Sequence, residues 1–428
     1  MNSSVLSTSV GNAGTVAPTV AWWAPPDQLD RRARRVLIVL AFASLPVGYL
    51  NTLLTQTVSF AADEFHATDT AQGFSLAAVR GGVLISLVVV GLADRHGRRL
   101  VALLTLASAP IVCALGALAP NLVVLTATQI VGRPLAISLG LVIVIIATEE
   151  MPKGSRAYAV SLLSISAAVG AGACLVVLPL ADLGKRGWRL VYVAPLLFLA
   201  LVPIVARHLP ESRRYQAPHP NAEFKGHGRR FWLLAISGLL TNLLVAPASG
   251  FQNRYLKKVR GFSAKRVALF SLVTNSPGGL GVVVGGRLAD NHGRRIVAAV
   301  GLAGGSIATV AVFSVGGAWM WVWSTAGALL GALAVPALGV YSAELFPTGL
   351  RGRANAAITV VSLAGSAVGL VLTGALVHDT GGYGPVMAGL AIGPLIVVIL
   401  VLVLYPETAR IELEDINPED RVEEAPTT

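Results

Sequence analysis

Residues 286–295 read GRLADNHGRR, and residues 90–99 read VGLADRHGRR, 196 positions earlier. Working outward from these stretches, 13 of the 26 positions aligned between residues 74–99 and 270–295 are identical. A second similarity follows each copy: Glu149, Pro152 and Arg156 return as Glu344, Pro347 and Arg351 at an offset of 195. A repeat with a nearly constant offset predicts that the chain is built from two similar halves.

The composition indicates which environment these halves occupy. The 428 residues are 54% hydrophobic and 13% charged, whereas a soluble domain has roughly 25% charged residues. This balance predicts a membrane protein and argues against a disordered, collagen-like or disulfide-stapled chain. The two cysteines, Cys113 and Cys174, fall in apolar runs and are predicted to be free thiols.

Twelve apolar runs are long enough to cross a hydrocarbon core, which needs about 20 residues per helix. They cover residues 36–60, 72–93, 101–119, 122–148, 157–181, 189–206, 231–253, 267–289, 296–316, 319–343, 354–377 and 384–405. With the repeat, they predict an all-α membrane protein of twelve transmembrane helices in two pseudo-symmetric six-helix bundles. The predicted parts are an N-terminal tail (1–35), the first bundle (36–206), a linker (207–230), the second bundle (231–405) and a C-terminal tail (406–428).

The basic residues predict how the chain lies in the membrane. With both tails inside, and with Arg287 and Arg189 at span ends counted to their sides, the inner side holds 22 Lys and Arg and the outer side holds 9, so the positive-inside rule places both termini in the cytoplasm. The net charge of +11 therefore reports topology and not a nucleic-acid surface. One outer loop departs from the rule, since it carries Arg254, Lys257, Lys258, Arg260, Lys265 and Arg266. We expect it to be a solvated loop, with the attraction of anions as the alternative.

The repeated stretch resembles the loop motif of the major facilitator superfamily, Gly-x-Leu-Ala-Asp-x-x-Gly-Arg-Arg, with Val90 in the first glycine position of the earlier copy. The resemblance implies the two-bundle fold and a cytoplasmic latch that opens and closes during transport. The residues that it assigns to the latch are Asp94, Arg95, Gly97, Arg98, Asp290, Gly293 and Arg294. Glycine permits a sharp turn at Gly97 and Gly293. The alternative is that these charges only orient the helices in the membrane.

Four further segments resemble the sugar-porter branch of that superfamily. They are the two Glu-x-x-Pro stretches, Pro210-Glu211-Ser212-Arg213-Arg214, and Pro406-Glu407-Thr408. All lie at predicted cytoplasmic helix ends, and the resemblance implies a gating network there. It adds Glu149, Arg156, Glu211, Glu344, Arg351 and Glu407 to the candidate gating residues.

Two arginines, Arg80 and Arg133, lie in the middle of predicted spans, whereas all 22 Asp and Glu lie in loops, tails or helix ends. Charges within the membrane are costly and are candidates for function. Proton-coupled sugar porters resemble this chain at an arginine in span 4, but their Gly-Tyr-Asp in span 1 reads Gly48-Tyr49-Leu50 here. The missing acid leaves two interpretations: an anionic substrate supplies the carboxylate, or the arginines reach outward to Asp63, Glu64 or water.

Polar side chains on several spans face a similar choice between two roles. They can bind a polar solute or hold helices together by hydrogen bonds. The substrate-binding candidates of this kind are Asn51, Thr55, Gln56, Gln129, Asn242, Gln252 and Asn275. The pattern Gly365-x3-Gly369 is typical of close helix packing.

Together these features predict a secondary active transporter in the plasma (inner) membrane that works by alternating access. The favoured substrate is a small organic anion, a carboxylate or sugar acid, with a proton as the candidate coupling ion. The alternatives are a neutral sugar or polyol facilitator or symporter and, in another class, a non-transporting membrane sensor. We expect a monomer that contacts its substrate and the lipid bilayer, and no nucleic acid, cofactor, metal site or enzymatic activity, because no phosphate-binding, catalytic or metal-ligand motif is present.

Overall fold

The computed structural model describes residues 29–152, 155–210, 227–346 and 348–408. The first half contains α1 (Arg31–Glu64), α2 (Asp69–Gly81), α3 (Val83–His96), α4 (Arg98–Ala114), α5 (Leu122–Glu150), α6 (Arg156–Val177), α7 (Trp188–Val193) and α8 (Leu201–His208), with short 3-10 helices η1 (Leu115–Leu118), η3 (Leu178–Leu183) and η4 (Ala194–Ala200). The second half contains α9 (Gly228–Lys258), α10 (Ala264–Asn275), α11 (Gly278–His292), α12 (Arg294–Ser314), α13 (Ala318–Glu344), α14 (Thr348–Leu376) and α15 (Tyr383–Leu404).

Twelve segments within the described residues are long and apolar enough to cross a membrane, from Arg31–Glu64 to Tyr383–Leu404. Each overlaps one of the twelve predicted runs, and the predicted fold class is confirmed. Helices suit this environment because they satisfy their backbone hydrogen bonds internally. Large apolar side chains such as Leu197 (80% exposed) and Leu118 (77% exposed) point outward, as expected of a surface that contacts lipid.

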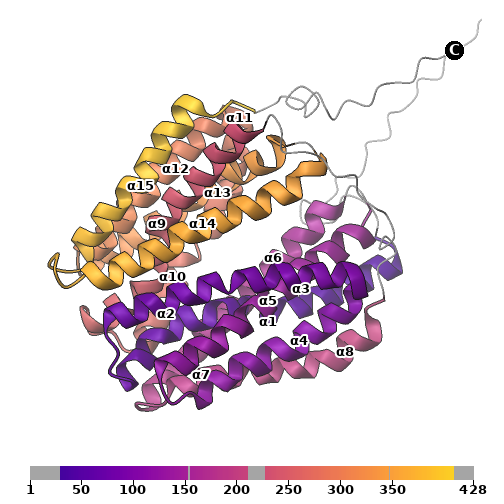
Figure 1. The fold of residues 1–428 in the computed structure, drawn as a ribbon, viewed down its shortest axis with the longest axis horizontal. Helices are drawn as coiled ribbons and strands as arrows, with labels where there is room; N and C mark the ends of the chain where they lie inside the picture. Colours follow the sequence, from indigo (N-terminus) through magenta and orange to yellow (C-terminus); the bar gives the residue numbers. More distant parts are fainter. Residues whose placement is uncertain (1–28, 153–154, 211–226, 347, 409–428) are drawn as a thin grey trace, which may run out of the picture.

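Figure 1 shows the two halves as two bundles whose helices lie against each other at one end and diverge toward the other. The end where they meet carries the turns around residues 63–70, 253–266 and 374–383, and we call it the joined end. The opposite end carries the turns at Gly97 and Gly293, and we call it the motif end.

Two predicted spans are divided in the structure, at equivalent positions of the repeat. The span at 72–93 is split between α2 and α3 at Gly82, and the span at 267–289 is split between α10 and α11 at Ser276–Pro277. Glycine weakens a helix and proline lacks the backbone N–H that continues one. A Cβ on Gly82 would lie 2.6 Å from the carbonyl oxygen of Ile130, so the first break packs directly on α5.

The glycines of the repeated motif make identical turns. Gly97 has φ 98° and ψ 139°, and Gly293 has φ 97° and ψ 139°. Both values lie where side chains other than glycine are strained. The sharp turns expected from the sequence are therefore present in both halves. Close packing is also seen at Gly365 and Gly369, where a Cβ would lie 2.1 Å and 2.3 Å from carbonyl oxygens of α9.

We predict that Gly293→Ala lowers the free energy of unfolding by about 1–3 kcal/mol, the usual cost of a strained backbone conformation. The new Cβ would also lie 2.9 Å from Oε2 of Glu407. Thermal unfolding of the purified protein in detergent measures the change. Gly91→Ala is the matched control, because Gly91 is helical with no atom within 4 Å of its Cβ position. Equal destabilisation by both substitutions would contradict the prediction.

Candidate substrate site and gates

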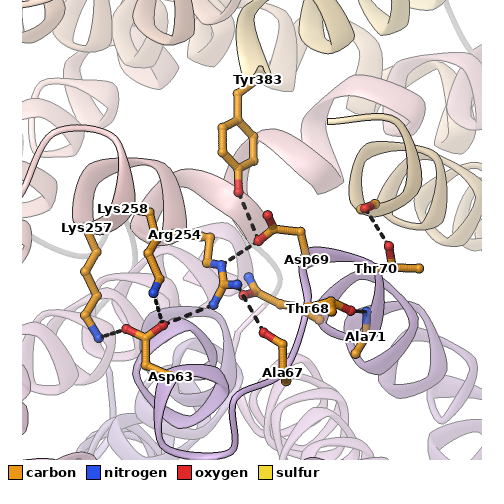
Figure 2. Close-up of polar contacts among 12 residues, drawn as sticks. Asp63, Ala67, Thr68, Asp69, Thr70, Ala71, Arg254, Lys257, Lys258 and Tyr383 are labelled. Atoms are coloured by element: carbon orange, nitrogen blue, oxygen red, sulfur yellow. Dashed lines mark hydrogen bonds and ion pairs between the residues drawn. The ribbon is translucent and has the colours of Figure 1, made fainter. Parts of the chain in front are cut away.

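The joined end is held by an ion-pair cluster between the two halves. Arg254 of α9 donates from Nε to Oδ1 of Asp69 at 2.5 Å and from Nη1 to Oδ1 of Asp63 at 3.3 Å. Its Nη2 donates to the carbonyl oxygen of Ala67 at 3.2 Å. Figure 2 shows this guanidinium between the two carboxylates. With its side chain 7% exposed, Arg254 is a buried cation whose partners come from the other half.

Both carboxylates have further partners in the second half. The Tyr383 hydroxyl donates to Oδ1 of Asp69 at 3.3 Å, and Nε2 of His378 lies 3.0 Å from Oδ2 of Asp69. Asp63 binds the ammonium groups of Lys257 and Lys258 (Figure 2). The first half thus supplies the acids of this cluster, and the second half supplies the donors.

Hydrogen bonds extend the same contact across the joined end. Asn253 donates to the Gln56 side chain at 2.7 Å, and Thr70 donates to the carbonyl oxygen of Gly374 at 2.9 Å. Asp182 accepts the backbone N–H groups of Ala264 and Lys265 at 2.8 and 2.9 Å. The last contact places a carboxylate of the first half at the N-terminus of α10, where a negative charge is favoured.

The expectation of a solvated loop between spans 7 and 8 is therefore wrong for Arg254, Lys257 and Lys258. These residues extend α9 beyond the predicted end at residue 253 and bind acids of the other half. Two features of the sequence indicated such a contact. The outer loop between spans 7 and 8 has basic residues where the positive-inside rule expects few, and the outer loop between spans 1 and 2 has the acids Asp63 and Asp69. The sequence alone did not indicate which basic residue binds which acid.

At the motif end, two equivalent ion pairs that the structure describes each lie within one half. Arg98 pairs with Glu149 in the first half, and Arg294 pairs with Glu344 at the equivalent place in the second. The backbone N–H groups of Arg294 and Arg295 also donate to Glu407 at 3.0 and 3.3 Å. Glu407 thus caps the N-terminus of α12.

The structure covers the candidate gating residues unevenly. Gly97, Arg98, Glu149, Gly293, Arg294, Glu344 and Glu407 lie in the turns and pairs just described, and Arg95 is exposed at the end of α3. Glu211 and the side chains of Asp94, Asp290, Arg156 and Arg351 lie outside the described residues. The structure thus places these residues in two symmetric ion pairs and one helix cap, and their gating role stays a prediction.

Arg80 and Arg133 lie on neighbouring helices of the first half. Arg80 is in the last turn of α2, beside the break at Gly82, and a basic residue there interacts favourably with the C-terminus of the helix. Arg133 is in α5 and half-buried, and its Nε is buried with no hydrogen-bond partner. Gly82, two residues after Arg80, packs on the carbonyl oxygen of Ile130, three residues before Arg133, so both arginines lie next to one contact between α2 and α5.

Neither Asp63 nor Glu64 is the partner of these arginines. Asp63 binds the cluster at the joined end, and Glu64 accepts from Trp188 at 2.6 Å and from Arg189 at 2.9 Å. Within the described parts of the chain, no ion pair or hydrogen bond to the guanidinium groups of Arg80 and Arg133 is found. The two cations are thus available to a bound anion.

Some candidate polar side chains hold helices together. Gln129 is fully buried and donates to the carbonyl oxygen of Cys113 at 3.4 Å. Asn242 donates to Gly238 and accepts from Ser366 at 3.1 Å, which joins α9 to α14. Gln56 belongs to the contact between the halves.

Other candidates border open space. Gln252 and Asn275 line a cavity of about 490 Å³ in the second half, together with Thr241 and Ser249. The rest of its lining is mainly apolar and includes no charged side chain. Asn51 and Thr55 are half-buried on α1. The volume suits a small organic molecule, since ligand pockets of roughly 300–1,000 Å³ are typical.

The described residues thus form two six-helix bundles with charged clusters at both ends and two arginines for which the structure describes no partner, an arrangement that suits a membrane transporter. A family model described as the Major Facilitator Superfamily matches residues 37–276 and 255–421. The chain belongs to this superfamily, which confirms the resemblance seen in its sequence. No curated protein matches the sequence significantly.

Solved structures share the fold at low sequence identity. A bacterial homologue of the human lysosomal transporter Spinster, inward-facing and occupied, is 19% identical with a TM-score of 0.70, over 93% of this chain and 100% of that one. The inward-open xylose transporter XylE from E. coli is 15% identical with a TM-score of 0.74, over 90% and 99%. The nucleoside transporter NupG is 12% identical with a TM-score of 0.74, over 87% and 100%.

We predict that Arg254→Gln opens the joined end, because it removes the shared partner of Asp63 and Asp69. Pulsed electron spin resonance between labels at His66→Cys and Asp379→Cys measures the separation of the halves. The native cysteines are buried. We expect a longer distance to appear in Arg254→Gln and not in Lys265→Gln, which removes an exposed cation of the same end. An unchanged distance distribution in Arg254→Gln would rule out a dominant role for the cluster.

We also predict energetic coupling in the symmetric pairs at the motif end. The Arg294 and Glu344 side chains are 11% and 13% exposed, and a hydrogen bond to a charged group contributes about 1.5–3 kcal/mol. A double-mutant cycle of Arg294→Gln and Glu344→Gln on the free energy of unfolding should show coupling of that order. Arg294 with the distant Glu150 provides the control cycle, for which we expect additivity.

Proposed function

We propose that the protein is a secondary active transporter of a small organic anion, a carboxylate or sugar acid, and that Arg80 and Arg133 bind its anionic group. One observation carries this proposal: two arginines on neighbouring helices at membrane depth have no acidic partner among the described residues, while the nearby acids are paired elsewhere. A buried unpaired cation is costly. A substrate carboxylate would offset that cost and suits guanidinium groups through bidentate hydrogen bonds.

The orientation that we propose has the motif end and both termini in the cytoplasm of a plasma or inner membrane. The excess of Lys and Arg in the segments at that end supports it through the positive-inside rule. The joined end then faces outward, and the structure corresponds to an inward-facing state. The inward-facing states of the similar Spinster homologue and XylE support this interpretation.

Alternating access follows from the difference between the two ends. The cluster around Arg254 closes the outer end, whereas the bundles diverge toward the inner end (Figure 1). In the opposite state the outer cluster breaks, and the motif residues, with Asp94 and Asp290 among them, act as the inner latch. The free-energy difference between the states is then set largely by charge pairing at the two ends.

Proton coupling, if present, uses a route other than the acid–arginine pair of proton-coupled sugar porters. At the position of that acid this chain has Leu50, whose side chain is fully buried in a hydrophobic cluster formed by residues of both halves. A proton remains the candidate coupling ion. The dependence of uptake on an imposed pH gradient measures it.

A neutral sugar or polyol is the second candidate substrate. The polar residues of the second-half cavity, Thr241, Ser249, Gln252 and Asn275, favour it, as does the fold shared with the xylose transporter XylE. If the substrate is neutral, Arg80 and Arg133 have no role in binding it. We expect the protein to act as a monomer in either case.

Substrate flux into liposomes reconstituted with the purified protein tests the proposal. Gluconate and small mono- and dicarboxylates are compared with glucose and neutral polyols. We expect transport of an anion, and a decrease of about ten- to hundredfold in Arg133→Gln or Arg80→Gln, the loss of one charged hydrogen bond. Arg287→Gln, an exposed arginine of α11, is the control and should leave uptake intact.

Three outcomes would contradict the proposal. Anion uptake that is unchanged in both variants would mean that the two arginines do not bind the substrate. Glucose uptake without gluconate uptake favours the neutral substrate. Absence of flux for every solute, with ligand-dependent stabilisation retained, favours a non-transporting sensor.

A further inference from the structure

A second cavity lies at the motif end of the first half, away from the space between the bundles. Its volume is about 610 Å³. Five arginines and one histidine line it with three other residues: Arg31, Arg32, Arg35, Val36, Arg99, Arg207, His208, Leu209 and Pro210. The lining comes from the N-terminus of α1, the start of α4 and the end of α8, and it includes no acidic side chain.

The positive charge of this cavity is only partly compensated. Arg32 pairs with Glu150, with Nε 3.1 Å from Oε2, and Arg99 donates to the carbonyl oxygen of Ala206 at 2.7 Å. Among the described residues, no carboxylate pairs with Arg31, Arg35 or Arg207. The nearby Asp30 accepts the N–H of Ala33 as the cap of α1. A cavity with three available guanidinium groups favours an anion with several oxygen atoms, such as a phosphate.

The helices that line the cavity also carry exposed apolar side chains close to it in sequence. Arg31, Arg35, Ile38 and Phe42 follow each other at spacings of four, three and four residues, so they share one face of α1. Ile38 is 47% exposed and Phe42 is 52% exposed. On α8, Ile204 is 48% exposed and lies one turn before His208. A ligand with its charged group at the arginines would therefore have apolar side chains immediately beneath it.

We propose that this cavity binds the phosphate headgroup of an anionic phospholipid, whose acyl chains lie along α1 and α8. A free phosphate would use the arginines but not the exposed apolar face that continues from them. The site is at the motif end, which we place at the cytoplasmic surface, where anionic lipids are found. Basic residues next to the hydrocarbon core attract such headgroups, and the attraction weakens with salt.

Thermal stability of the full-length protein in a neutral detergent tests the site, with added phosphatidylglycerol, phosphatidylcholine or inorganic phosphate as separate probes. We expect phosphatidylglycerol to raise the melting temperature more than phosphatidylcholine does, and inorganic phosphate to have little effect at the same concentration. The apparent affinity for phosphatidylglycerol should fall about ten- to thirtyfold in the double variant Arg31→Gln/Arg207→Gln.

The double variant Arg229→Gln/Arg287→Gln is the matched control. It removes two exposed arginines of the second half and should keep the full response to phosphatidylglycerol. Equal affinity of the cavity variant and the wild type would overturn the proposal, as would an equal response to phosphatidylcholine. A response to inorganic phosphate alone that matches phosphatidylglycerol would assign the cavity to a soluble anion instead.

Discussion

At the joined end, a guanidinium of the second half lies between two carboxylates of the first, with 7% of its side chain exposed. Separating such groups in a medium of low polarity leaves charges that neither lipid nor apolar side chains solvate. The halves can therefore part at this end only if water or other partners reach Arg254, Asp63 and Asp69. Helix packing within each bundle has no comparable requirement, so the contact between the bundles is the part of the structure that depends most on these charges. Ion pairing at the helix ends thus influences how the two bundles lie against each other.

The two ends pair their charges according to different rules. At the motif end, Arg98–Glu149 and Arg294–Glu344 repeat the same pair in each half, and the turn at Gly97 is copied at Gly293. At the joined end the halves are complementary instead of alike, with acids on one and cations on the other. Duplication of one sequence accounts for the first pattern. The second needs differences between the copies, because two identical surfaces of like charge repel each other.

This difference explains what the sequence could predict. The apolar runs and the repeat were enough for the twelve helices, the two bundles and the turns at Gly97 and Gly293. The breaks at Gly82 and Pro277 were missed because the apolar stretches on either side of each break together form one span that is long enough to cross the membrane. The pairing of Arg254 with Asp69 joins residues 185 positions apart, and the repeat says nothing about contacts between unlike segments. Spacing alone also could not separate Asn242, which bonds to Ser366, from Gln252, which lines a cavity.

The contact of Asp182 with the N-terminus of α10 has a consequence for the solvent. Two backbone amides of one half are satisfied by a side chain of the other, in the way that a helix usually satisfies them with its own capping residue. Whenever the halves are apart, Ala264 and Lys265 must hydrogen-bond to water, and the carboxylate of Asp182 must be hydrated as well. The hydration of this surface therefore contributes to the free-energy difference between the joined and the separated halves. Osmolytes, which change the water activity, are expected to shift the equilibrium between these two states.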